Sequence, residues 1–195
     1  MECDNAADPA AAASSNKSRP VKLYLVIANI CKISNVRQLL LTATAMDLDG
    51  VLIVGQGRNL DIDDESQLPS GFVEQVDAGN ITLLRFPKWK ECVLYLQEQS
   101  MTLVGIEIDE SAVVLDRDYF LDSHQPLTSD TALMPGNEGD GIHPKHMADC
   151  HQFVRIPQYG VGTASFNVNV ATSMVLYRYQ QERRRQQQLL SQIDS

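Results

Sequence analysis

The sequence lacks the signatures of several large protein classes. No apolar run approaches the ~20 residues that span a bilayer. The four cysteines are far apart and form no Cys-x-x-Cys pair, so the spacing indicates free thiols rather than a zinc site or a disulfide framework. Positive charge is also scarce. A formal net charge of -9 argues against a broadly basic nucleic-acid clamp and leaves room only for a local basic patch.

Common catalytic motifs are missing as well. The chain contains no Gly-x-Gly-x-x-Gly fingerprint, no phosphate loop with its lysine and no Gly-x-Ser-x-Gly elbow. His143 and His146 are three residues apart on a short expected helix, but no carboxylate or thiol at ligand spacing completes a metal set. We therefore expect surface histidines and no metal.

The composition indicates one folded domain behind a tail. Residues 1–20 are rich in Ala, Ser and Asn without periodicity, which predicts a disordered tail. This stretch lacks the basic and apolar pattern of a signal peptide and is too acidic for a transit peptide. With 44% hydrophobic and 21% charged residues, residues 21–195 are expected to form a single globular domain. We expect no membrane association and a cytoplasmic location, with the nucleus as the alternative.

Strand-like and helix-like segments alternate along that domain. The expected strands are residues 21–28, 51–54, 81–86, 102–108, 131–134 and 153–156. The expected helices are residues 34–46, 89–99 and 144–148, and a long one from about 165 to 193. Ser34 or Asn35 is expected to cap the first helix, and residues 55–70 form a polar loop. This alternation predicts an α/β fold with a mostly parallel sheet flanked by helices.

Two segments near the end of the chain predict a ligand pocket. In each, Leu133–Gly141 and Ile156–Ala171, an apolar strand runs into a glycine-bearing loop that opens a helix. Open α/β sheets bind ligands at such strand ends, where Asn137 and Glu138 lie, and a first helical turn at Ser165 would expose free N–H groups. The alternatives are an ordinary glycine turn, with Ser165 as a helix cap and Asn167 as a first-turn filler.

Together these segments resemble the SpoU/TrmH branch of the SPOUT RNA methyltransferases. That family has a strand followed by Gly-Asn-Glu-Gly-x-Gly, then Ile-Pro with a glycine-bearing loop, then Ser-Leu-Asn-Val-x-Val-Ala opening the last helix. The chain matches at residues 136–141, 156–157 and 165–171, with Phe166 in place of the usual Leu. Both motifs occur in the right order and at the right distance, and a weaker match extends back to Val21.

The resemblance implies a SAM-dependent RNA 2'-O-ribose methyltransferase with a deep C-terminal trefoil knot, acting as a homodimer. SAM would lie in the knot. The RNA site of the dimer would combine the first helix of one subunit with the knot of the other. The family's cofactor positions correspond to Ile106, Gly136, Ile156, Ser165 and Phe166. Glu138 and Asn167 correspond to polar residues beside the methyl-transfer centre, and Asn35 and Ser165 keep their motif positions.

The first motif departs from the family. There the opening helix reads Asn-x-Gly, with an Arg four residues after the Gly. Here Arg37 occupies the glycine position and Leu41 the arginine position, so the residue expected to activate the ribose hydroxyl is missing. General-base assistance is typically worth about 100- to 10,000-fold in rate, and leucine cannot provide it.

Three interpretations of Arg37 stay open. It precedes Leu41 by one helical turn, so its long side chain could reach the same site, and we favour this retained activity. Alternatively, the chain is a weakened or inactive dimer that serves as an RNA-binding or scaffold protein. Arg37 could also be a surface arginine that covers apolar neighbours. An unrelated nucleotide-binding α/β protein has little support, because its glycine spacings do not fit.

RNA contacts are expected from scattered basic residues, with tRNA favoured over rRNA because compact family members often act there. The candidates are Lys32, Arg37, Arg58, Lys88, Lys90 and Arg155. Residues 183–185, three arginines late in the terminal helix, indicate a solvated face that complements the helix dipole. An RNA-phosphate contact is the alternative for these arginines.

Overall fold

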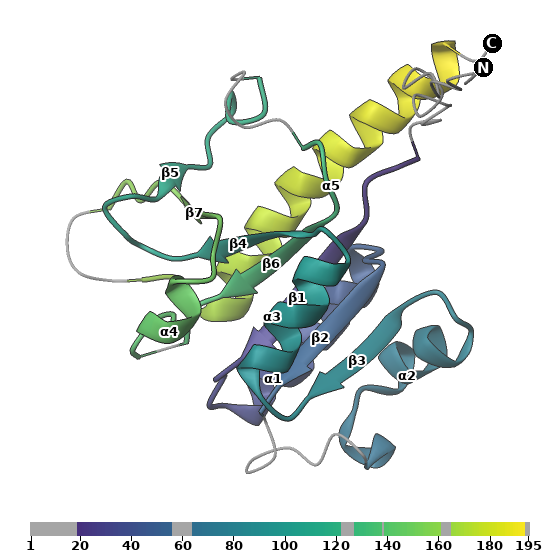
Figure 1. Ribbon diagram of the computed structural model, residues 1–195, viewed down its shortest axis with the longest axis vertical. Helices are drawn as coiled ribbons and strands as arrows, with labels where there is room; N and C mark the ends of the chain where they lie inside the picture. Colours follow the sequence, from purple (N-terminus) through teal and green to yellow (C-terminus); the bar gives the residue numbers. More distant parts are fainter. Residues whose placement is uncertain (1–18, 56–63, 122–126, 138, 161–164, 194–195) are drawn as a thin grey trace, which may run out of the picture.

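The protein is a three-layer α/β structure built on one parallel sheet. The computed structural model describes residues 19–55, 64–121, 127–137, 139–160 and 165–193 (Figure 1). Within them the 7-stranded sheet has the order β3-β2-β1-β6-β4-β7-β5, and every pairing is parallel. The strands are β1 (Leu23–Ala28), β2 (Gly50–Val54), β3 (Thr82–Phe86), β4 (Thr102–Ile106), β5 (Val113–Val114), β6 (Thr131–Pro135) and β7 (Gln152–Arg155). The helices are α1 (Ile33–Ala45), α2 (Ser70–Asp77), α3 (Trp89–Glu98), α4 (Pro144–Met147) and α5 (Val168–Ile193), with a 3-10 turn η2 (Glu65–Gln67).

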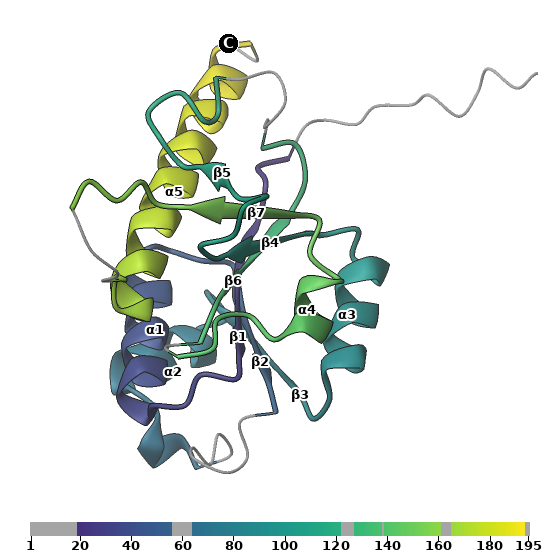
Figure 2. The ribbon, with the colours of Figure 1, turned by 90° about the vertical axis from the view of Figure 1, so that its left-hand side faces the viewer.

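Helices cover both faces of the sheet. Successive side chains of a strand point to opposite faces, so Leu23, Leu25 and Ile27 of β1 belong to a core shared with α1, α2 and α5. Tyr24 and Val26 belong to a second core shared with α3. Figure 2 shows α1, α2 and α5 on one side of the sheet and α3 and α4 on the other. Burial on both faces explains why the central strands are almost uninterrupted apolar runs.

The expected α/β class and parallel sheet are confirmed, but the sequence reading missed two elements. Helix α2 follows the polar loop, is only 8 residues long and buries only Phe72. Strand β5 consists of two residues at the sheet edge, too short to show alternation. The other expected elements all occur, with ends shifted by one to three residues.

Both expected helix starts are wrong in detail. Helix α1 begins at Ile33, its N-cap is Lys32, and no side chain caps it, so neither Ser34 nor Asn35 is the cap. Helix α5 begins at Val168 rather than near Ser165. The Asn167 side-chain oxygen accepts a hydrogen bond from the Asn169 N–H at 2.9 Å, which makes Asn167 the capping residue. Ser165 is thereby left outside the helix.

Arg183 does not lie on the solvated face that the charge run predicted. Its guanidinium donates to the Asp49 carboxylate at 2.5 Å and to the Asp47 carbonyl at 2.7 Å, and only 8% of the side chain is exposed. Asp49 also accepts the Leu23 N–H at 2.8 Å. The pair therefore ties α5 to the starts of β1 and β2. Arg184 is exposed, as expected.

The beginning of the described chain is tied down. Arg19, assigned above to the tail, forms two hydrogen bonds with the Asp130 carboxylate at 3.0 and 2.7 Å. Residues 1–18 lie outside the described part. The trefoil knot stays a prediction, because residues 161–164 between β7 and α5 are also outside it. Among the described helices, none is long and apolar enough to cross a membrane.

Replacing Arg183 with methionine should destabilise the protein by about 3 kcal/mol, because it leaves the Asp49 carboxylate without its buried cation. Urea denaturation of the purified variant measures this loss. Arg184→Met is the matched control on the exposed side of the same helix and should change stability by no more than about 0.5 kcal/mol. Equal effects of the two changes would contradict a structural role for the pair.

Candidate functional site

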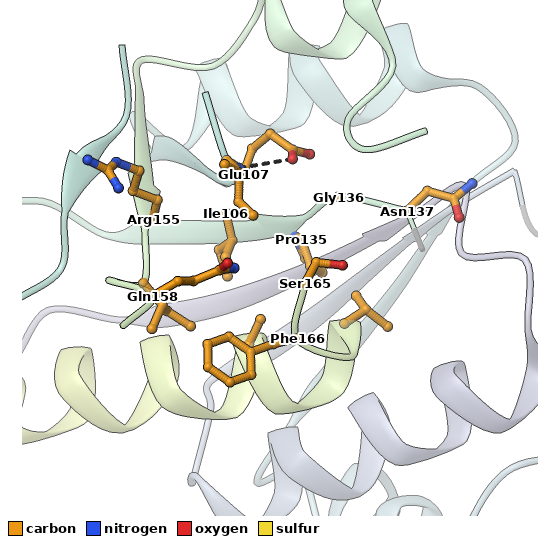
Figure 3. A pocket seen from close by; sticks show the side chains of 13 residues that line it. Ile106, Glu107, Pro135, Gly136, Asn137, Arg155, Gln158, Ser165 and Phe166 are labelled. Carbon is orange, nitrogen blue, oxygen red and sulfur yellow. Dashed lines mark hydrogen bonds between the residues drawn. The ribbon is translucent and has the colours of Figure 1, made fainter. Parts of the chain in front are cut away.

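A cavity lies at the carboxyl ends of β4, β6 and β7 (Figure 3). Parallel strands end at one edge of a sheet, and ligands of open α/β proteins bind there. The cavity walls come from the ends of these strands, from the loop after β6 and from the segment that enters α5. The lining includes Ile106, Glu107, Gly136, Asn137, Arg155, Ile156, Gln158, Ser165, Phe166 and Val168.

Every residue predicted to bind the cofactor lines this one cavity. Ile106 ends β4, Gly136 follows β6 and Ile156 follows β7. Ser165 and Phe166 approach from the segment before α5, and Phe166 keeps 45% of its surface exposed. Figure 3 shows Phe166 beside the start of α5 and Glu107 on the opposite side. Residues far apart in sequence thus converge, as the paired motifs predicted.

The glycine-rich loop after β6 is a small closed turn. Gly136 donates its N–H to the Ile106 carbonyl at 3.2 Å, which fixes the end of β6 against β4. Asn137 and Gly141 exchange two backbone hydrogen bonds of 3.0 and 3.2 Å, so the loop closes on itself. Gly141 has a φ of 67°, a conformation that favours glycine. Glu138, predicted to be catalytic, lies outside the described residues.

Hydrogen bonds join the start of α5 to α1. The Asn167 amide donates to the Asn35 side-chain oxygen at 3.3 Å. Thr42 on α1 donates to the Asn169 side chain at 2.9 Å. Two of the predicted catalytic positions, Asn35 and Asn167, are therefore in contact. Asn35 is buried, and neither residue lines the cavity.

Arg37 lies on the exposed side of α1 and is not part of the cavity lining. Leu41, one turn further, is 42% exposed. Arg155 is the cationic side chain that does line the cavity. The sequence reading listed Arg155 only as an RNA contact, although its place at a strand end marked it as a pocket residue.

Glu107 is a pocket residue that the sequence reading missed. It was counted within the fourth expected strand, but β4 ends at Ile106 and frees the Glu107 side chain. Its carboxylate accepts the Ile142 N–H at 2.8 Å and the Ile108 N–H at 2.9 Å. An acidic residue directly after a buried apolar strand was the available signal.

Among the described residues, the histidines and thiols do not gather into a cluster. His146 stacks on Trp89 with ring centroids 4.1 Å apart, and burial, with His143 nearby, lowers its pKa. Burial raises the pKa of the Cys92 thiol to about 12, and burial and Asp149 do the same for Cys150. Across the described part of the chain, no group of three or more His, Cys, Asp or Glu side chains could hold a metal ion.

Comparison with known proteins identifies the family. The model of the SpoU rRNA Methylase family matches residues 22–177. The chain belongs to this family. The match covers every described strand, four of the five α-helices completely and the first part of α5, up to Tyr177.

Individual relatives share less than a third of their aligned residues with this chain. The 23S rRNA (guanosine-2'-O-)-methyltransferase RlmB of Coxiella burnetii is 27% identical over 100 residues, which are 51% of this chain and 36% of RlmB. The SpoU methyltransferase AviRb from Streptomyces viridochromogenes superposes with a TM-score of 0.64 and 22% identity, over 85% of this chain and 61% of AviRb. The A. aeolicus TrmH/SpoU tRNA modifying enzyme gives a TM-score of 0.63 at 19% identity, over 88% and 79% of the two chains. The matched part of the chain thus spans about a third of RlmB and just under two thirds of AviRb.

Asn167 caps α5 and also contacts Asn35, and two substitutions can separate these roles. Asn167→Ala removes both and should cost about 1 kcal/mol of stability, the usual loss for an N-cap. Asn167→Asp cannot donate to Asn35 but keeps a capping oxygen. Because the cap is kept, the thermal stability of this variant should stay near that of the wild type. Thermal unfolding of both variants measures this difference. Equal losses in the two would show that the cap is not the main structural role.

Proposed function

We propose that the protein is a SAM-dependent RNA 2'-O-ribose methyltransferase. The observation that carries the proposal is that Ile106, Gly136, Ile156, Ser165 and Phe166, assigned by motif alone, line one cavity at the strand ends. Family membership supports the same reaction class. Because the chain covers only part of RlmB and AviRb, the reaction and its substrate are inferred for this chain rather than transferred from them.

The cavity fits the cofactor in its donor set. Backbone groups at the ends of β4, β6 and β7 can meet the edge of an adenine ring, and the exposed Phe166 side chain offers apolar contact. Ser165 contributes a hydroxyl, and Glu107 and Arg155 contribute one charge of each sign. When bound, SAM supplies a methyl group on a positively charged sulfur, which a ribose oxygen can attack. The residues of this chain must therefore orient the ribose and accept its proton.

Proton removal is the step for which the chain has no family residue, since Leu41 replaces the motif arginine. Arg37 is the replacement we infer, because its exposed side chain lies one turn earlier on α1. Arg155 is a further polar group in the cavity lining. A dimer that binds SAM or RNA without methyl transfer is the second candidate, favoured specifically by Leu41.

A homodimer is supported by exposed apolar side chains on α5. Val170, Met174 and Tyr177 recur at helical spacing along this helix and are 45, 42 and 54% exposed. A row of exposed apolar side chains of this kind marks a candidate interface in a soluble protein. Leu41, which is 42% exposed on α1, is a further apolar position that a partner could cover.

RNA as the substrate is supported by where the basic residues lie. Lys32 follows β1, Lys88 and Lys90 follow β3, and Arg155 ends β7. The sheet is parallel, so all of these positions lie at the same edge as the cavity, where they can attract phosphates locally in an acidic protein. Arg58 lies outside the described residues. The preference for tRNA and a reducing cytosolic or nuclear compartment stay predictions.

The reaction is tested by methyl transfer from labelled SAM to pools of total tRNA and rRNA. We expect transfer to tRNA, lowered about 100-fold or more by Arg37→Ala if Arg37 activates the hydroxyl, with SAM affinity unchanged. Arg184→Ala is the control for loss of one exposed arginine. Unchanged transfer by Arg37→Ala would remove Arg37 from the mechanism. SAM binding without transfer to either pool would favour the scaffold function, and absence of SAM binding would refute the methyltransferase function.

The dimer is tested by sedimentation. Wild-type protein should sediment as a dimer, and Met174→Glu should shift it to monomer, because a buried charge at the centre of an apolar interface has no partner. Leu94→Glu is the matched control, since Leu94 is 48% exposed on α3. A monomeric wild type, or equal behaviour of the two variants, would rule out this face as the interface.

A further inference from the structure

We propose that Glu107 is a positioning residue, whose carboxylate holds the described parts of the loop after β6, residues 136–137 and 139–142, in the arrangement that forms one wall of the cavity. The identity of the ligand rests on the proposed function. The contacts that hold the loop do not, so the two can be tested separately.

The backbone of Glu107 is fixed before its side chain acts. Its N–H donates to the Val154 carbonyl at 3.0 Å, which anchors the residue to β7 just past the end of β4. From this point the side chain reaches across to the loop after β6, where Oε2 accepts the Ile142 N–H at 2.8 Å. Oε1 accepts the Ile108 N–H at 2.9 Å and so orients the carboxylate. One side chain thus joins the ends of β4 and β7 to the far end of the glycine loop.

The glycines of the loop leave the space that this carboxylate fills. A Cβ on Gly136 would lie 2.2 Å from Glu107 Oε2, and a Cβ on Gly141 would lie 2.5 Å from the same atom. Both distances are far shorter than a van der Waals contact. A Cβ on Gly139, the third glycine of the motif, would meet nothing within 4 Å. A side chain at Gly136 or Gly141 would therefore have to displace the Glu107 carboxylate, whereas one at Gly139 would not.

The loop has a second anchor in the core. The Ile142 side chain is buried and lies under Gly105 of β4, at 2.9 Å from where a Cβ would be. Ile142 is held in place by the hydrogen bond at its N–H and by the packing of its side chain. The backbone hydrogen bonds between Asn137 and Gly141 connect this fixed residue to Gly136 and Asn137, which line the cavity. Without the carboxylate the Ile142 N–H loses its acceptor, and the wall is no longer held to β4.

A glutamine substitution tests the role at constant size. In Glu107→Gln the amide group has one oxygen for two N–H donors, and its NH2 would face one of them. We expect SAM affinity, measured by calorimetry, to fall about 10- to 100-fold, while the thermal midpoint changes little. Glu110→Gln is the matched control, because Glu110 is an exposed acidic residue three positions along the same segment. If the wild type binds SAM, equal SAM affinity in the two variants would overturn the proposal.

Hydrogen exchange of the cofactor-free protein separates this proposal from the proposed function. The Ile142 amide should be protected in the wild type and in Glu110→Gln, and should exchange at least tenfold faster in Glu107→Gln. Faster exchange confirms that the Glu107 carboxylate holds the loop, even if SAM does not bind. An Ile142 amide with unchanged protection in Glu107→Gln overturns it even if SAM does bind.

A double-mutant cycle tests the steric part. Gly136→Ala should lower the urea midpoint in the wild-type background and should have a smaller effect in Glu107→Ala, where the carboxylate is gone. Gly139→Ala is the control and should have the same small effect in both backgrounds. Additive losses for Gly136→Ala and Glu107→Ala would show that the carboxylate and the glycine do not share the space.

Discussion

The structure depends on a sheet whose strands all run in one direction and are covered by helices on both faces. Parallel strands need a crossover between each pair, and each crossover returns the chain to the edge where the strands begin. All carboxyl ends therefore meet at the other edge, and the loops that leave them converge. Ile106, Gly136 and Ile156 come from different strands for this reason. The opposite edge is held by ion pairs such as Arg183 with Asp49, which have no part in the cavity.

The sequence predicted the elements with strong apolar patterns and failed where a tertiary contact decides the outcome. The runs in β1, β2 and β6 are buried along their whole length and are visible as unbroken apolar stretches. The short β5 and the lightly buried α2 carry no such pattern. Arg183 looked like a surface residue because its partners, Asp47 and Asp49, precede it by more than 130 positions.

The site shows the same division. The residues expected to meet the cofactor were found because two motifs specify them, and the sheet brings them together. Glu107 and the capping role of Asn167 were missed, because each depends on where an element ends to within one or two residues. Such boundaries are set by hydrogen bonds with distant segments, as with the Ile142 N–H on Glu107. The carboxylate also gives a physical reason for two of the motif glycines that the motif alone does not supply.

The contact between Asn35 and Asn167 places α1 and the segment entering α5 in one hydrogen-bonded unit. Helix α1 carries Arg37 on its exposed side, and the segment before α5 carries Ser165 and Phe166 into the cavity. A ligand that shifts one helix must then strain or release the other. By thermodynamic reciprocity, the affinity for a molecule docked on α1 and the affinity for one in the cavity would each depend on whether the other is bound. The order in which the two arrive would then affect the rate of assembly but not the final stability of the ternary complex.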